Sequence, residues 1–169
     1  MKTKDVALCG LLIAVALVLS IIEKMFPLQA VVPVPGIKLG LANVVTVFAL
    51  SRLDTKRAAV IVLCRVALTS IFMGSVTGFA FALCGGLLSL AVMRLLLPHT
   101  GRALSLLGVS VAGAAAHNIG QICAAIAVLG TADVLGYLPL LLVSAVPMGL
   151  VTGLTASETL AHLDKIARH

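Results

Sequence analysis

Residues 104–129 read LSLLGVSVAGAAAHNIGQICAAIAVL, an apolar run with a polar group at its centre. About 26 residues, at ~1.5 Å per residue, are long enough to cross a bilayer with some tilt. Near the middle, His117 lies four residues before Gln121 and Asn118 lies three before it, so all three side chains can share one helix face. Polar groups are costly in hydrocarbon unless they meet partners. This face therefore indicates either a ligand cavity or hydrogen bonds to other membrane helices.

The composition of the whole chain is that of a polytopic membrane protein. Hydrophobic residues make up 61% of its 169 residues and charged residues only 11%, which excludes a soluble domain of ordinary make-up. The formal net charge is +6, but the basic residues stand singly at the ends of apolar runs. That pattern is a topology signal, and we expect no nucleic-acid partner.

The apolar runs predict an all-α integral membrane protein with six transmembrane helices in a single domain covering residues 1–169. The expected spans are residues 6–22, 38–51, 58–73, 79–97, 104–129 and 137–155, followed by an amphipathic surface helix at 157–169. With the N-terminus inside, the outer loops carry only Lys24 and Lys38 as basic residues. The inner segments carry Lys2, Lys4, Arg52, Lys56, Arg57, Arg94, Arg102, Lys165 and Arg168. The positive-inside rule then predicts that both termini are cytoplasmic.

Arg65 stands in the middle of the third expected span, with Thr69 one turn later. An arginine at this depth costs roughly 2.5–3.5 kcal/mol on insertion scales, so it needs a partner. No acidic residue lies inside any of the expected spans. The partner is therefore backbone carbonyls, polar groups of other helices, water or an anionic part of a ligand, unless the side chain snorkels to the interface.

The predicted topology places several polar residues along one outward-facing pocket. Lys38 lies at the outer mouth of the second span, and Asn43, Arg65 and His117 lie progressively deeper. A basic, hydrogen-bonding pocket suits a small ligand with a carboxylate, a phosphate or polar carbonyls. The Pro-rich stretch at residues 25–36, just before Lys38, is either a lid over the pocket or a plain connector.

Small residues indicate where helices approach one another closely. Gly10 and Ala14 form a small-xxx-small pair in the first span, which suits either packing within the chain or contact with another subunit. Gly85 and Gly86 stand together in the fourth span, where they allow close backbone approach or a bend.

Other chemistry has little support in the sequence. The cysteines show no CxxC spacing, and His117 has no second histidine or thiolate near it in the sequence, so we expect no metal site and no cofactor. The chain has no Gly-x4-Gly-Lys-Ser/Thr motif, so any dependence on ATP must come from partners. We expect that the chain is not an enzyme.

Several stretches in the same order resemble the bacterial Gx transporter family, often labelled heptaprenyl diphosphate synthase component I. They are PGIKLGLAN at residues 35–43, Arg65, GGLLS at 85–89 and AHNIGQ at 116–121, and the similarity covers about residues 6–155. That family in turn resembles the substrate-binding S components of energy-coupling factor transporters, which are six-helix proteins with a ligand site near the outer face.

The resemblance implies an S-component-like bundle in a bacterial cell membrane, which binds a vitamin-like, cofactor-precursor or isoprenoid-related or quinone-related molecule. It further implies a transmembrane coupling subunit and two cytosolic ATPases as partners, with Gly10 and Ala14 at the coupling contact. On this reading the substrate-binding residues are Lys38, Asn43, Arg65, Thr69, His117, Asn118 and Gln121.

Two other readings remain. On the first, the chain is an accessory membrane subunit of heptaprenyl (polyprenyl) diphosphate synthesis, although it has no clustered aspartates that could bind magnesium diphosphate. Alternatively it is a secondary transporter or channel that acts alone, which the absence of carboxylates inside the expected spans disfavours.

Overall fold

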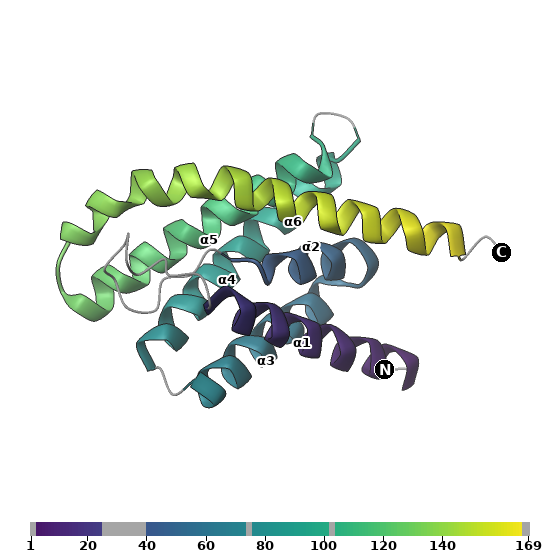
Figure 1. Ribbon diagram of the computed structural model, residues 1–169, viewed down its shortest axis with the longest axis horizontal. Coiled ribbons are helices and arrows are strands. Elements are labelled where there is room, and N and C mark those ends of the chain that lie inside the picture. Colours follow the sequence, from purple (N-terminus) through teal and green to yellow (C-terminus); the bar gives the residue numbers. More distant parts are fainter. Residues whose placement is uncertain (1–2, 25–39, 74–75, 102–103, 167–169) are drawn as a thin grey trace.

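The computed structural model describes residues 3–24, 40–73, 76–101 and 104–166. The described residues form helices and turns and no strand, which confirms the all-helical class. Figure 1 shows the helices packed side by side, with the first helix beginning and the last helix ending at the same end of the molecule. The helices are α1 (Thr3–Lys24), α2 (Asn43–Arg52), α3 (Thr55–Met73), α4 (Val76–Leu96), η2 (Leu97–His99), α5 (Leu106–Leu129), η3 (Asp133–Tyr137) and α6 (Leu138–Ile166).

Four of these helical stretches are long and apolar enough to cross a membrane: Asp5–Glu23, Val76–His99, Leu106–Leu129 and Asp133–Ile166. The other two expected spans, residues 38–51 and 58–73, do not meet these criteria of length and apolar composition. Helix α2 has 10 residues, about 15 Å of helix, which is too short to cross alone. Helix α3 has 19 residues but carries Lys56, Arg57 and Arg65. Residues 25–39, which include Lys38 and the Pro-rich stretch, lie outside the described part of the chain.

The polar-centred run forms α5, with a cap at each end. The Ser105 side chain accepts a hydrogen bond from the Gly108 backbone N–H at 3.1 Å, which caps the N-terminus. Gly130 has φ +70° at the C-terminus, the left-handed conformation that ends many helices. The structured helix therefore covers nearly all of the predicted span at residues 104–129.

Helix α5 lies between α4 and α6 (Figure 1), and glycines allow both contacts to be close. A Cβ added to Gly120 would lie 2.7 Å from the Cys84 carbonyl oxygen, and one added to Gly149 would lie 2.4 Å from Val111 Cα. Backbone thus touches backbone on both sides of α5, as small residues permit in membrane bundles. The expected close approach at the glycine pair of α4 is confirmed.

Helix α6 runs through the predicted boundary between the last span and the amphipathic tail. It continues as one helix of 29 residues from Leu138 to Ile166, through Pro147. Its last turns are exposed apart from contacts with the end of α2, where Arg52 pairs with Asp164 and donates a hydrogen bond to the Leu160 carbonyl oxygen at 3.2 Å. Since no turn residue breaks the pattern between 155 and 157, the helix simply continues.

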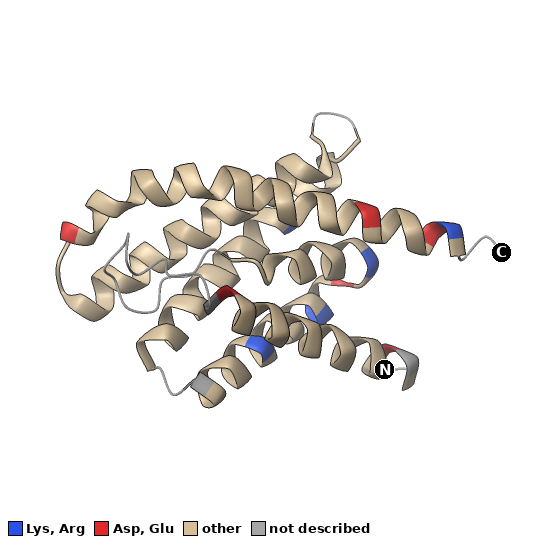
Figure 2. Cartoon of the chain, viewed as in Figure 1, with Lys and Arg blue, Asp and Glu red and all other residues tan. Residues whose placement is uncertain are grey.

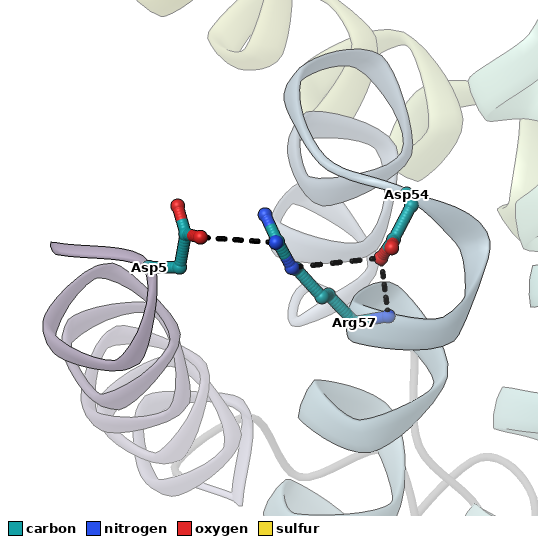
Figure 3. Close-up of polar contacts among 3 residues, drawn as sticks. All are labelled: Asp5, Asp54 and Arg57. Atoms are coloured by element: carbon teal, nitrogen blue, oxygen red, sulfur yellow. Dashed lines mark hydrogen bonds and ion pairs between the residues drawn. The ribbon is translucent and has the colours of Figure 1, made fainter. Parts of the chain in front are cut away.

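Charged residues gather mostly at the end of the molecule where α1 begins and α6 ends (Figure 2). There Arg57 of α3 donates to the Asp5 carboxylate of α1 at 2.9 Å, and its backbone N–H donates to Asp54 at 2.8 Å (Figure 3). Arg94 of α4 donates to the Thr55 hydroxyl at 2.8 Å. These contacts tie the ends of α1, α3 and α4 together outside the apolar body of the bundle.

Candidate functional site

The predicted binding residues that the structure describes are all buried. None is more than 5% exposed, although each carries a polar or charged side chain. Groups of this kind are rarely fully buried unless they are paired or serve a function. The six residues are Asn43, Arg65, Thr69, His117, Asn118 and Gln121; the seventh, Lys38, lies outside the described residues.

The polar face of α5 is divided between two neighbours. His117 Nε2 and Gln121 Nε2 are 2.9 Å apart, so these two side chains do lie together on one face. Asn118 turns instead to α6, where its Nδ2 donates to the Leu141 carbonyl oxygen at 2.6 Å. Successive residues on a helix point about 100° apart, so Asn118 reaches α6 in a different direction from that of its neighbour His117. The buried Oδ1 of Asn118 has no partner among the described residues, so Asn118 stays a predicted binding residue together with His117 and Gln121.

His117 is held between two glycines. A Cβ added to Gly85 of α4 would lie 2.9 Å from both Nδ1 and Cε1 of the ring. On its other side, a Cβ added to Gly40, just before α2, would lie 3.3 Å from His117 Cδ2 and 3.0 Å from Asn43 Nδ2. Gly40 also has φ +90°, a conformation that side-chain-bearing residues rarely adopt. The two glycines thus bring the backbones of α4 and of the start of α2 against the imidazole ring.

Glu23, at the end of α1, is a site residue that the sequence analysis missed. Its side chain is only 5% exposed, and its Oε1 accepts a very short hydrogen bond from the Gly40 backbone N–H. It also interacts electrostatically with Arg65 of α3. The predicted first span ended at residue 22, so Glu23 lay just outside the expected spans. One signal in the sequence could have indicated it. Glu23 is an acidic residue directly at the end of a span, and Arg65 in the middle of another span needs a partner.

Arg65 joins this site through α4. A Cβ added to Gly86 of α4 would lie 3.3 Å from Arg65 Nη2, so the guanidinium packs against the glycine next to Gly85. The contacts therefore run from Glu23 to Gly40, to His117, to Gly85 and its neighbour Gly86, and to Arg65. We call Glu23, Gly40, Asn43, Arg65 and His117 the polar ring; its members come from four different parts of the chain.

Several hydrogen-bonding atoms at the polar ring have no partner among the described residues. They are Arg65 Nε and Nη2 and both side-chain atoms of Asn43, together with Thr69 Oγ1, which follows Arg65 by one turn of α3. A buried polar atom without a partner costs about 1–3 kcal/mol. Such atoms gathered at one place are typical of a site that is completed by a bound molecule.

Gly10 and Ala14 lie elsewhere. Both are exposed on α1, and no atom lies within 4 Å of a Cβ added to Gly10. They are therefore not used for packing within the described chain. Across the described residues, no group of three or more His, Cys, Asp or Glu side chains could hold a metal ion.

Comparison with known proteins identifies one family. The model of the family described as heptaprenyl diphosphate synthase component I matches residues 12–159. The match includes α2 to α5 and most of α1 and α6, and therefore every member of the polar ring. No curated protein and no solved structure matches the chain.

Proposed function

This chain belongs to the heptaprenyl diphosphate synthase component I family, and we propose that it is the substrate-binding membrane subunit of an importer of the energy-coupling factor type. Its cargo is a small vitamin-like, cofactor-precursor or isoprenoid-related or quinone-related molecule. The observation that carries the proposal is the polar ring, where donors and acceptors without protein partners are buried among apolar helices. A binding subunit needs such groups, whereas a purely structural bundle gains nothing from them.

The arrangement of charge supports the orientation that such a subunit needs. Helix α1 begins and α6 ends at the end of the molecule that carries most of the charged residues (Figure 2). The positive-inside rule places that end in the cytoplasm of a bacterial cell. With both chain ends inside, the four long helices together with α2 and α3 make six passages in this proposal.

The exposed small residues of α1 support a subunit interface. Gly10 and Ala14 present backbone that no other part of the described chain covers, which suits close approach of a transmembrane coupling subunit. In this proposal, that subunit connects the chain to two cytosolic ATPases, and the chain itself performs no catalysis.

A second candidate is an accessory membrane subunit of heptaprenyl diphosphate synthesis, and the description of the family favours it. In that case the polar ring would hold an isoprenoid or quinone precursor for a catalytic partner. The two candidates differ in the proteins that bind the chain.

The decisive experiment is affinity purification of the tagged chain from its host in mild detergent, with mass spectrometry of the proteins retained. A coupling subunit and ATPases support the importer. A prenyl diphosphate synthase without ATPases overturns it in favour of the accessory subunit, and recovery of neither contradicts both.

A matched pair of variants tests the interface. Gly10→Leu combined with Ala14→Leu should lose the coupling subunit, because the larger side chains block close approach. Ala91→Leu, at an exposed position of α4, should keep it. If both variants retained the coupling subunit equally, the α1 interface would be contradicted. The importer proposal itself would still be decided by the affinity purification of the unchanged chain.

A further inference from the structure

An apolar groove lies along α2, between α1 and the second half of α6 (Figure 1). Its volume is about 440 Å³, within the ~300–1,000 Å³ that is typical of ligand pockets. Leu12 and Val45 are buried in its floor, whereas Leu11 and Val15 of α1 are exposed along its rim. Because α1 is long and apolar enough to cross a membrane, the groove opens sideways to the bilayer.

The groove offers little hydrogen bonding to a ligand. The described residues that line it are apolar except for Thr155 and Thr159 of α6. The Thr155 hydroxyl donates to the Val151 carbonyl oxygen at 2.8 Å, and the Thr159 hydroxyl donates to the Thr155 carbonyl oxygen at 2.7 Å. Since both hydroxyl hydrogens are used within the helix, the groove suits a hydrocarbon chain better than a polar molecule.

One end of the groove meets the polar ring. Leu19 lines the groove and lies one helical turn before Glu23, so these two side chains share a face of α1. Val44 lines the groove and directly follows Asn43. The hydrogen bond from the Gly40 backbone N–H to Glu23 joins α1 to the start of α2 at this end. The apolar groove and the polar ring are therefore neighbouring parts of one surface.

A molecule that occupies both places needs a definite shape. From Leu19 the groove follows α1 back to Leu8, about 16 Å at ~1.5 Å per residue, toward the end of the molecule that carries most of the charged residues (Figure 2). Asn43 is 1% exposed, and neither its Oδ1 nor its Nδ2 has a partner among the described residues. Buried hydrogen-bonding atoms at one end of a long apolar groove are complementary to a polar head on a hydrocarbon chain.

Building on the proposed function, we propose that the ligand is an amphiphile, whose hydrogen-bonding head lies at Asn43 in the polar ring and whose linear hydrocarbon chain lies in the groove. It enters from the bilayer between α1 and α6. The chain gains little by moving from lipid into the groove, because lipid is as apolar as the leucine side chains there. Preference for this ligand over the surrounding lipids therefore comes from the head.

The test uses tryptophan fluorescence, because the chain contains no tryptophan. Phe48→Trp places a reporter in the groove, and Leu154→Trp places one on the exposed surface of α6, beside Thr155 but outside the groove. The full chain is reconstituted in phosphatidylcholine nanodiscs and titrated with dibromostearyl alcohol, whose bromine atoms quench tryptophan that they contact. Half-quenching of the Phe48→Trp protein should occur at about a tenfold lower mole fraction of the alcohol than that of the Leu154→Trp protein.

Two further measurements connect the groove to the polar ring. Asn43→Leu, added to Phe48→Trp, should remove this preference, because leucine has a similar size but forms no hydrogen bond with the head. Brominated phosphatidylcholine should quench both reporters at similar mole fractions, because its headgroup stays at the membrane surface.

Three results would overturn the proposal. Equal half-quenching of the two reporters by the alcohol would show that the groove does not select the amphiphile. A preference that survives Asn43→Leu would show that the head does not lie at the polar ring. An equal preference for brominated phosphatidylcholine would assign the groove to a membrane lipid.

Two provisions cover variants that do not fold. Leu11→Trp, on the rim of the groove, replaces Phe48→Trp, and if Asn43→Leu does not fold, the comparison of the alcohol with brominated phosphatidylcholine decides alone. None of these measurements involves partner proteins. A chain that fails them and still retains a coupling subunit and ATPases would contradict the amphiphile and support the importer, so the two failures are distinguishable.

Discussion

The imidazole of His117 packs directly on Gly85: a Cβ added to Gly85 would lie 2.9 Å from ring atoms Nδ1 and Cε1 and 2.8 Å from the His117 backbone carbonyl oxygen. Helices α4 and α5 therefore meet at the polar ring with no room for a side chain on Gly85. The position of the histidine depends on the backbone of a neighbouring helix.

Gly85→Ala should lower the free energy of unfolding by about 1–3 kcal/mol, because the new methyl group meets backbone that cannot move aside. Thermal unfolding in detergent measures the effect. Gly10→Ala is the matched control, since its methyl group meets nothing within 4 Å. It should be neutral or slightly stabilising through its better helix propensity. Equal midpoints for the two variants would contradict the close contact at His117.

Arg65 and Glu23 should be energetically coupled. Arg65→Met alone removes a positive charge that attracts the buried Glu23 carboxylate, and Glu23→Gln alone removes a negative charge that attracts Arg65. The double variant should therefore be more stable than the sum of the single effects predicts, by about 0.5–3 kcal/mol. A double-mutant cycle of unfolding free energies measures this coupling. Strict additivity would show that the two side chains do not interact.

The sequence by itself predicts that Arg65→Ala weakens ligand binding more than it harms folding, because no acidic residue lies inside the expected spans. Because Glu23 interacts electrostatically with Arg65, we expect the same change to lower stability as well, and the double variant separates the two effects.

The α5–α6 contact should be less tolerant than the α4–α5 contact near Met93. Gly149→Ala places a methyl group 2.4 Å from Val111 Cα, whereas Gly113→Ala places one 1.9 Å from Met93 Cε, the end of a flexible side chain. We expect Gly149→Ala to cost more than Gly113→Ala, each by a few kcal/mol at most. Met93→Ala should restore part of the loss in Gly113→Ala and none in Gly149→Ala. Thermal unfolding of the four variants tests this, and rescue of Gly149→Ala would contradict it.

Arg57 should contribute only modestly to stability. Its side chain is 29% exposed and pairs with Asp5, 27% exposed, so solvent screens the interaction. Arg57→Gln should cost about 0.2–1 kcal/mol in chemical unfolding, with a smaller difference at high salt. Lys56→Gln, one residue away and exposed, is the control and should show no such salt dependence. A loss of several kcal/mol in the free energy of unfolding would contradict this expectation. It would show that the contact between Arg57 and Asp5 (Figure 3) contributes strongly to joining α1 to α3.

Much of the site was accessible from the sequence because the bilayer restricts where polar residues occur. Asn43, Arg65, Thr69, His117 and Gln121 stand out as polar side chains in apolar runs, and all are buried. Glu23 was missed because it lies one residue beyond the expected end of the first span. Hydropathy does not define the end of a span to within a single residue. The hydrogen bond from Asn118 to Leu141 of α6 was not predictable, because spacing alone does not give the rotation of α5 between α4 and α6.

The sequence by itself determined that this is an all-helical membrane protein of the heptaprenyl diphosphate synthase component I family, because solvent preference and family motifs are carried by residue types and their order. Tertiary structure decided which polar groups lie together. Glu23 and His117 are far apart in the sequence, yet both contact Gly40, because the glycines at 40 and 85 let the start of α2 and helices α4 and α5 approach one another closely. That arrangement depends on helix rotation and packing distance, which no local pattern encodes.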